Sequence, residues 1–401
     1  MPVQSALDDQ LRQGIARIRK ADLLVGIPSF RNAGTIGHVA STVARGLHEH
    51  FPDARVVLVN ADGGSEDGTP DRVLEAVGKS DIPVLTGRYV GPPGKGSAFR
   101  AIFEVAVGLD VRGCAVVDSD LRSITPLWIL QLLGPIVRAE ADYVAPLYGR
   151  HKHDGTITNS IAYPLTRALY GLRIRQPIGG EFGFQADLAR AYLAQPVWES
   201  DVARFGIDIF MTTTAIARHA RVVQAFLGAK IHDPKDPAAD LGPMFTEVVG
   251  TLFRLAAENE PLWRESVGSC PVPVVGQSEP VEPEATPVDA RRLLAKYAAG
   301  AAEQRALWDE VLSAPVPAAM GPDSWARIVF DFLEAAVRRP GDSERLARGL
   351  LPLYYARVAE FVEEAKNMTT AQAEDIVEQG ALAMEKEKQD RVISQEERTA
   401  R

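Results

Sequence analysis

The stretch Cys114-Ala-Val-Val-Asp-Ser-Asp120 decides the fold, because an apolar run ends directly in two aspartates that lie two positions apart. A short apolar run bounded by polar residues is typical of a buried strand, and ligands of open α/β sheets bind beyond the carboxyl ends of such strands. Asp118 and Asp120 can together address a divalent cation, since Mg²⁺ and Mn²⁺ prefer oxygen ligands. A metal there could neutralise a diphosphate leaving group. A solvated turn is the commoner explanation of an isolated Asp-x-Asp, and the position at the end of a buried strand narrows the difference between the two interpretations.

The segments on either side continue an alternation of strands and helices. Strands are expected at 23–28, 55–60, 114–117, 143–147 and 222–227, and helices at 35–50, 97–109, 127–141, 187–193 and 207–219. Short runs rich in Val, Leu and Ile, separated by amphipathic segments, are typical of βα units in a largely parallel sheet. We therefore predict an α/β protein with a Rossmann-like mixed sheet, whose last strand is residues 222–227.

Two glycine-rich segments also lie at expected ligand-binding positions. In Asn60-Ala-Asp-Gly-Gly-Ser65 the glycines allow backbone turns close to a ligand, and Asp62 can accept hydrogen bonds from a nucleobase or ribose. In Gly91-Pro-Pro-Gly-Lys-Gly-Ser97, Lys95 and the amides of a helix N-terminus can meet phosphate. The second segment is not a P-loop, because the required glycine spacing is absent. A surface turn with a solvated lysine would account for it equally well.

In this order the segments resemble the nucleotide-sugar glycosyltransferases with the GT-A fold, and among them the retaining synthases of mannosylglycerate and of glucosyl-3-phosphoglycerate. The resemblance runs in pieces from about residue 26 to residue 233. Besides the motifs quoted above, it rests on Pro28, Phe30, Ser119, Gln176-Pro-Ile-Gly-Gly-Glu181, Gly206-Ile-Asp208 and Lys230-Ile-His232. Each piece is short, and it is the ordered set that identifies the family.

The resemblance implies a metal site with three protein ligands. His232 would complete the site that Asp118 and Asp120 begin, and the cofactor would be Mg²⁺ or Mn²⁺. An imidazole ligand suits Mn²⁺ better than Mg²⁺. A loop histidine next to Asp233 is the alternative interpretation of His232.

The resemblance also assigns substrate contacts. On the side of the nucleotide sugar, the residues that match substrate-binding positions are Pro28, Phe30, Asp62, Lys95 and Ser119. On the side of the acceptor, Arg150 and Thr158 match positions that hold the carboxylate and hydroxyl of glycerate, and a guanidinium fork suits a carboxylate geometrically. A solvated loop would explain both acceptor residues as well.

The turn at Gly179 and Gly180 would let the backbone approach the transferred sugar. Glu181 would accept hydrogen bonds from sugar hydroxyls, and Asp208 would do the same for the donor sugar or the acceptor. Together with Asp120, these two carboxylates are the candidate catalytic residues. Asp208 could instead only favour the N-terminus of its helix.

Composition narrows the class of protein further. The chain has 401 residues with 46% hydrophobic content, which is enough for a large domain and a smaller one. A net charge of −9 lacks the basic surplus of a nucleic-acid-binding protein, and two cysteines cannot form a disulfide framework. With neither a signal-peptide pattern nor the roughly 20 apolar residues that span a bilayer, a cytoplasmic location without a transmembrane segment is expected.

The chain is expected to divide at residue 243. Residues 1–242 would form the GT-A catalytic domain that binds the nucleotide sugar and acceptor. Residues 243–401 would form a helical domain with a Pro- and Glu-rich loop near 270–288, and this domain would cover the site or mediate homodimerisation.

The function that the resemblance implies is retaining transfer of glucose or mannose from a nucleotide-diphosphate sugar to D-glycerate or 3-phosphoglycerate. The product would be a glucosylglycerate- or mannosylglycerate-type compatible solute or its precursor. Transfer to another small alcohol or a lipid is an alternative. A sugar-nucleotide nucleotidyltransferase is another, although Ile27-Pro-Ser-Phe-Arg-Asn32 lacks the glycine-rich signature usual there. A noncatalytic nucleotide-sugar sensor could dispense with the metal ligands.

Overall fold

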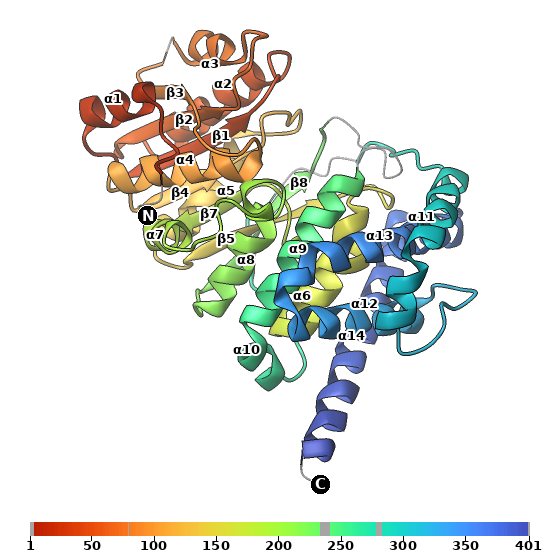
Figure 1. The fold of residues 1–401 in the computed structure, drawn as a ribbon. Coiled ribbons are helices and arrows are strands. Elements are labelled where there is room, and N and C mark those ends of the chain that lie inside the picture. The colour runs from red at the N-terminus through yellow and green to blue at the C-terminus, as the bar shows by residue number, and fades with distance from the viewer. Residues whose placement is uncertain (1–3, 79, 233–240, 278–282, 400–401) are drawn as a thin grey trace. The chain divides into compact units, whose positions relative to one another are not determined.

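The computed structural model describes residues 4–78, 80–232, 241–277 and 283–399. The chain forms two units, whose elements are drawn in Figure 1. The sheet unit comprises Met1–Gly149, Gly179–Asp233 and Pro273–Pro283, and the helical unit comprises Arg150–Ile178, Pro234–Val272 and Glu284–Arg401. The chain therefore enters the helical unit three times and returns to the sheet unit twice.

In the described part of the sheet unit, eight strands form one sheet in the order β10-β8-β5-β7-β4-β1-β2-β3. Their bounds are β1 (Leu23–Ser29), β2 (Val56–Asp62), β3 (Val84–Arg88), β4 (Gly113–Val116), β5 (Tyr143–Gly149), β7 (Phe182–Gln185), β8 (Val222–Ala229) and β10 (Val274–Val275). Neighbouring strands run parallel except at β7, which is antiparallel to both β4 and β5. The predicted α/β class with a mixed sheet is confirmed.

Helices cover the sheet on both faces. Alternate residues of β1, namely Leu23, Val25 and Ile27, share a buried core with helices of one face. On the other face a Cβ added at Gly26 would lie 2.5 Å from a side-chain carbon of Ile102 in α4. The helices of this unit are α1 (Asp9–Ile18), α2 (Ile36–His50), α3 (Thr69–Val77), α4 (Lys95–Gly108), α5 (Pro126–Val137), α7 (Ala186–Leu193) and α8 (Ile207–Ala217), with a short 3₁₀ turn η2 (Asp201–Ala203).

Helix α2 shows how the sequence specifies this packing. Ile36, Val39, Val43 and Leu47 recur every three or four residues, and all four are fully buried against the sheet. Burial of each such aliphatic side chain contributes about 1.5–3 kcal/mol. Gly46 lies at the contact with α5, where an added Cβ would come within 2.8 Å of a backbone oxygen. A larger residue there would push the two helices apart.

The strand order reverses direction beside β1. The chain builds β1, β2 and β3 outward on one side of the sheet, then crosses to place β4 on the other side of β1. A reversal of this kind opens a crevice beyond the carboxyl ends of the two central strands. Because β7 is antiparallel to β4 and pairs Phe182 with Val116, the residue before β7 lies at this same edge. The edge therefore gathers residues that are far apart in the sequence.

The helical unit contains long helices and a two-stranded sheet. Its elements are η1, a π-helix (Thr158–Ala162), α6 (Tyr163–Tyr170), β6 (Leu172–Arg173), α9 (Leu241–Glu258), α10 (Glu260–Glu265), β9 (Cys270–Pro271), α11 (Ala290–Val311), α12 (Pro322–Arg338), η3 (Pro340–Asp342), α13 (Ser343–Glu364) and α14 (Thr370–Thr399). Helix α13 packs against α9, α11 and α12, while α14 packs against α6 and α12. No helix among the described residues is both long enough and apolar enough to cross a bilayer.

The observed units differ from the expected division at residue 243. Residues 150–178 belong to the helical unit, and residues 273–283, expected to lie in a loop of the helical domain, belong to the sheet unit. Strand β10 pairs with β8, so residues 222–227 lie in the penultimate strand and not the last one. A strand of two residues is too short to show the alternating pattern from which strands are predicted in a sequence.

Candidate active site

Three strands deliver ionisable side chains to the edge of the sheet beyond β4. Asp118 follows β4 and Lys230 follows β8, while Glu181 directly precedes the antiparallel strand β7. Two helices add a residue each at their first turns, Lys95 in α4 and Asp208 in α8. Five charged groups from five elements of the sheet unit thus converge on one place.

Asp118 lies between two lysines. Nζ of Lys95 is 2.9 Å from Oδ1 of Asp118, and Nζ of Lys230 is 3.0 Å from Oδ2. Burial would raise the pKa of Asp118, but the two ammonium groups outweigh it and hold that pKa well below its usual range. Asp118 is therefore ionised at neutral pH, with one lysine on each carboxylate oxygen.

Glu181 lies beneath this pair and is completely buried. Nζ of Lys230 lies 3.0 Å and 2.9 Å from its two carboxylate oxygens, and the hydroxyl of Tyr148 donates to it as well. Burial raises the pKa of Glu181 to about 7 in spite of the nearby lysine. Glu181 was expected to accept hydrogen bonds from sugar hydroxyls, but both of its oxygens are engaged and none of it reaches solvent. The structure instead makes Glu181 the support of Lys230.

Lys95 joins Asp208 to the same network. Its Nζ lies 3.4 Å from Oδ2 of Asp208 and 3.3 Å from Oδ1. Burial raises the pKa of Asp208, whereas for Lys95 the charges of Asp118 and Asp208 outweigh burial and raise its pKa. Oδ1 of Asp208 is buried and makes no hydrogen bond with a described residue. This atom of Asp208 thus has an ion-pair partner in Lys95 but no hydrogen bond, and its contact with a substrate hydroxyl stays a prediction.

Gly180 allows the backbone to pass close to these charges. Its φ of +96° lies in the left-handed region that favours glycine. A Cβ at this position would lie 2.4 Å from Oδ2 of Asp118 and 3.0 Å from Nζ of Lys230. The carbonyl of Gly179 accepts a hydrogen bond of 2.9 Å from the same Nζ. The predicted glycine turn is therefore needed for the contact of Lys230 with Asp118, and its approach to a sugar stays a prediction.

Among the described residues, Asp118, Asp120 and His232 do not form a group placed to share a metal ion. In the part of the chain that the structure describes, no group of three or more His, Cys, Asp or Glu side chains is placed to hold a metal ion. Each carboxylate oxygen of Asp118 is paired with a lysine. The carboxylate of Asp120, by contrast, is half-buried and forms no hydrogen bond or ion pair with another described residue. Of the two aspartates, Asp120 is the one whose oxygens fit a cation.

His232 is the last described residue before the stretch 233–240. Its carbonyl accepts a hydrogen bond of 3.2 Å from the guanidinium of Arg122, and the neighbouring amide of Ile231 donates to Ser123. Both contacts tie the segment after β8 to the segment after β4. The role of His232 as a metal ligand stays a prediction.

Asp62, at the end of β2, shapes the glycine-rich loop that follows it. Its carboxylate accepts hydrogen bonds from the hydroxyls of Ser29 and Ser65 and from the amides of Gly64 and Ser65, at 2.6–2.8 Å. Four donors already engage the two oxygens, so the observed role of Asp62 is to fold the loop. Its expected contact with a nucleobase or ribose stays a prediction.

An exposed aromatic ring lies above this loop. Phe30 follows β1, directly after Pro28 and Ser29, and is 54% exposed. A Cβ at Gly63 would lie 3.0 Å from its ring, and the guanidinium of Arg31 lies 5.0 Å from the ring centroid. A large exposed ring at the carboxyl edge of a sheet offers a surface on which a flat base can stack.

Asn32 connects this loop with the Asp118–Asp120 segment. Its side-chain oxygen accepts from the amide of Phe30 at 3.0 Å and from the hydroxyl of Ser119 at 2.8 Å. The hydroxyl of Thr35 donates to the carbonyl of Ser119. Ser119, predicted to bind substrate, is thus buried and links the ends of β1 and β4. Its contact with substrate stays a prediction.

The two predicted acceptor contacts belong to the helical unit. The guanidinium of Arg150 donates to Oε1 of Gln176 at 3.1 Å and pairs with Asp154 at 3.0 Å. Thr158 is buried at the start of the π-helix η1. Gly155 packs against both, since its added Cβ would lie 3.5 Å from Arg150 and 3.8 Å from Thr158. Arg150 and Thr158 are therefore close together, as a shared acceptor contact requires.

Three features of the site were not predicted from the sequence, namely Tyr148, Asn32 and the structural role of Lys230. The position of Lys230 directly after a strand was a signal, because it placed an ammonium group at the carboxyl edge. No sequence signal marks Tyr148, whose hydroxyl meets Glu181 only because β5 and β7 are neighbours in the sheet.

The chain is similar in sequence to glucosyl-3-phosphoglycerate synthases, although no family model matches it. It is 27% identical to the synthase of Mycolicibacterium smegmatis over 244 residues, which cover 57% of this chain and 76% of the relative. It is 25% identical to the synthase of Mycobacterium tuberculosis over 252 residues, which cover 57% of this chain and 72% of the relative. The suspected resemblance is thereby confirmed.

Solved structures of the M. tuberculosis synthase are also similar to this chain. One contains Mn²⁺, uridine diphosphate and glucosyl-3-phosphoglycerate, and it matches with a TM-score of 0.48 and 23% identity over 63% of this chain and 86% of the other. Another contains Mn²⁺, uridine-diphosphate-glucose and phosphoglyceric acid, with a TM-score of 0.48 and 23% identity over 64% and 88% of the two chains.

Proposed function

We propose that this protein is a GT-A-type glycosyltransferase that moves a glucosyl group from a nucleoside-diphosphate glucose to 3-phosphoglycerate, with a divalent cation. The proposal rests mainly on the different surroundings of the two aspartates at the sheet edge. Asp118 is paired with Lys95 and Lys230, whereas the carboxylate of Asp120 has no partner among the described residues. The sequence similarity to glucosyl-3-phosphoglycerate synthases supports the choice of sugar and acceptor.

The donor would lie across the crevice beside β1. Phe30 would stack on the base, and Asp120 would hold the cation with His232 as a further ligand. Such a cation supplies charge neutralisation for the departing diphosphate. Lys95 and Lys230 keep Asp118 ionised and fix the turn that presents Asp120. Donors and charges that are fixed before the reaction need no reorganisation during it.

The acceptor would bind through its anionic groups. Arg150 would contact the carboxylate and Thr158 a hydroxyl, since a guanidinium matches the geometry of a carboxylate. Asp208, whose Oδ1 lies 3.3 Å from Nζ of Lys95 and makes no hydrogen bond with a described residue, would accept a hydrogen bond from a hydroxyl of the sugar or acceptor. Transfer requires that such contacts hold the acceptor hydroxyl near the anomeric carbon.

The transfer would retain the anomeric configuration. The bond between the anomeric carbon and the diphosphate oxygen breaks with its electron pair going to the diphosphate, and the acceptor oxygen forms its bond on the same face. The acceptor proton leaves with the diphosphate oxygen. Glu181 is completely buried, with both oxygens engaged, so it cannot serve as the nucleophile of a double displacement. This burial favours same-face substitution over a covalent intermediate on Glu181.

The test is to measure release of nucleoside diphosphate by the pure protein with Mg²⁺ or Mn²⁺. Uridine-, guanosine- and adenosine-diphosphate glucose and mannose are each combined with 3-phosphoglycerate, with D-glycerate or with no acceptor. Release that depends on 3-phosphoglycerate, together with an α-linked product from an α-linked donor, supports the proposal. Absence of acceptor-dependent release across the panel contradicts it. Formation of pyrophosphate from a nucleoside triphosphate and glucose 1-phosphate would show a nucleotidyltransferase instead.

A further inference from the structure

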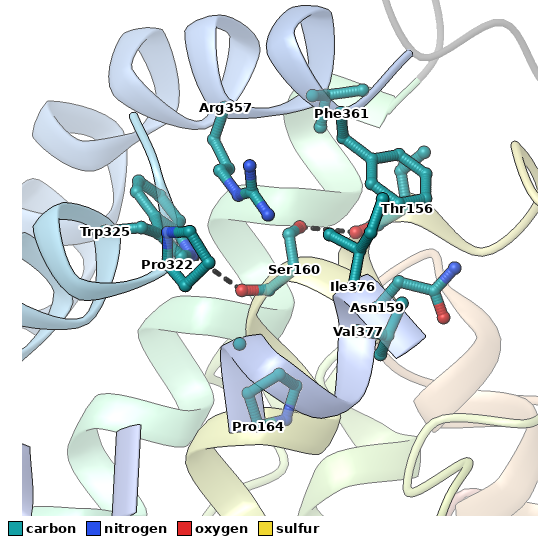
Figure 2. Close-up of a pocket in the computed structure, with 12 residues that line it drawn as sticks. Thr156, Asn159, Ser160, Pro164, Pro322, Trp325, Arg357, Phe361, Ile376 and Val377 are labelled. Atoms are coloured by element: carbon teal, nitrogen blue, oxygen red, sulfur yellow. Dashed lines mark hydrogen bonds between the residues drawn. The ribbon is translucent and has the colours of Figure 1, made fainter. Parts of the chain in front are cut away.

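A small cavity in the helical unit is lined by one charged side chain, that of Arg357, which has no hydrogen-bond or ion-pair partner among the described residues. Its walls come from η1 and the residues just before it and from α6, α12, α13 and α14, and Figure 2 shows the residues that line it. Most of them are apolar, namely Pro164, Pro322, Trp325, Val358, Phe361, Ile376 and Val377. None of the residues assigned to the sheet edge lines this cavity.

The neutral polar groups of the cavity wall are already satisfied. The hydroxyl of Thr156 is 2.7 Å from the hydroxyl of Tyr354, and the hydroxyl of Ser160 donates to the carbonyl of Thr156. The carbonyl of Ser160 accepts a hydrogen bond of 2.6 Å from the indole of Trp325. The side-chain amide of Asn159 donates to a backbone carbonyl and accepts from an arginine. None of these groups needs a ligand.

Arg357, unlike these neutral groups, has a buried donor that is not satisfied by a described residue. It is only 5% exposed, and its Nη1 is buried without a hydrogen-bond partner among the described residues. Figure 2 shows its guanidinium reaching from α13 into the cavity toward Ser160. A guanidinium cannot lower the cost of its burial by losing a proton, because arginine stays charged in proteins. A buried charge with no partner is costly, so an anion in the cavity would remove a large penalty.

The acids nearest to Arg357 do not neutralise it directly. Glu360 and Glu364 lie on the same helix and attract the guanidinium electrostatically. Yet no ion pair within 4 Å joins either acid to Arg357 among the described residues, and Oε2 of Glu360 is itself buried without a hydrogen bond. The guanidinium therefore keeps its capacity to bind an anion from outside.

The size of the cavity limits what that anion can be. The volume of the cavity is about 20 Å³. A single water needs roughly 10–15 Å³ by this measure, so one particle of about that size fits. Phosphate and sulfate are much larger, and a neutral water would leave the charge of Arg357 uncompensated. We propose that the cavity binds one monovalent halide-sized anion, such as chloride, through the guanidinium of Arg357.

Thermal unfolding of the full-length protein tests the proposal at constant ionic strength. Replacing sodium gluconate by sodium chloride should raise Tm in a saturable manner, by roughly 2–4 °C at saturation. Arg357→Met keeps much of the aliphatic stem and should lose this chloride-dependent rise. Arg348→Met is the matched control, because Arg348 lies on the same helix, is 64% exposed and pairs with Glu344. That control should keep the rise. Equal Tm values of the unmodified protein in the two salts would overturn the proposal, as would loss of the rise in both variants.

Bromide provides a direct measurement that does not depend on a folded variant. Crystals of the unmodified protein soaked in sodium bromide should give an anomalous scattering peak next to Nη1 of Arg357. A water molecule or an empty cavity at that position, in crystals that bind bromide elsewhere, would overturn the proposal.

Discussion

Replacing Glu181 by glutamine should remove a pH-dependent cost that burial of this carboxyl imposes on the fold. Burial raises the pKa of Glu181 from 4.5 to about 7. Between these two values the folded state binds more protons than the unfolded state, so stability falls as the pH rises through this window. A window of about 2.5 pH units at about 1.4 kcal/mol per unit amounts to roughly 3 kcal/mol.

Glu181→Gln retains the shape of the side chain and an acceptor for Lys230 but has no proton to lose. Relative to the unmodified protein, its free energy of unfolding should therefore improve by about 3 kcal/mol between pH 4.5 and pH 8. Urea unfolding measures this difference, with hydrogen exchange of the β4 amides reporting on the sheet unit.

Glu140→Gln is the matched control for this experiment. Glu140 is exposed, and its hydrogen bond from Arg138 lowers its pKa. Its contribution is therefore complete above pH 4.5 and is lost only on further acidification. The stability difference of Glu140→Gln should stay constant between pH 4.5 and pH 8. A pH-independent difference for Glu181→Gln as well would refute the assigned burial of this carboxyl.

Three further substitutions test the site. Gly180→Ala should destabilise the protein by about 2–3 kcal/mol, because its Cβ would lie 2.4 Å from Asp118 at a positive φ. Thermal unfolding measures this effect, and Gly34→Ala is the control, since nothing lies within 4 Å of a Cβ added there. Lys95→Met should lower kcat/KM by about 10²–10³-fold. It should also move the acidic limb of the pH–rate profile to higher pH, because Asp118 loses a cation that lowers its pKa. An acidic limb at the same pH would contradict this role of Lys95. Arg150→Ala should mainly raise the KM for the acceptor by weakening uniform binding; initial rates over a range of acceptor concentrations check it, and an unchanged KM would remove Arg150 from the pocket.

The sequence predicted most of the sheet because its strands carry strong local patterns. Val222–Ala229 and Leu23–Ser29 are apolar runs bounded by polar residues, and strands were expected at these positions. The place of the site at the carboxyl edge followed from the same pattern, because parallel strands collect their ends at one edge. Asp118 was found for this reason.

What could not be predicted depends on which strands become neighbours. Strand β7 has four residues with a glycine among them, and its antiparallel insertion between β4 and β5 leaves no periodic signal. Only this insertion brings Glu181 and Lys230 to Asp118. In the sequence the two aspartates therefore appeared equivalent as metal ligands. In the folded structure Asp118 instead forms ion pairs with two lysines.

The sequence also did not predict that residues 150–178 belong to the helical unit, for a related reason. The segment follows β5 without a break in composition, and its helix α6 packs against α14, which lies more than two hundred residues later. Contacts over such sequence distances leave no local pattern from which a domain boundary could be read.

The affinity of Mn²⁺ in the presence of a nucleoside diphosphate tests the central claim most directly. Electron paramagnetic resonance of free Mn²⁺ can be compared for the unmodified protein, Asp120→Asn and the control Asp71→Asn, which lies on the exposed side of α3. Loss of even an outer-sphere partner weakens metal binding about 10–100-fold, so Asp120→Asn should weaken it by at least about 100-fold, while Asp71→Asn leaves it unchanged. Equal affinity for Asp120→Asn and the unmodified protein would contradict the account.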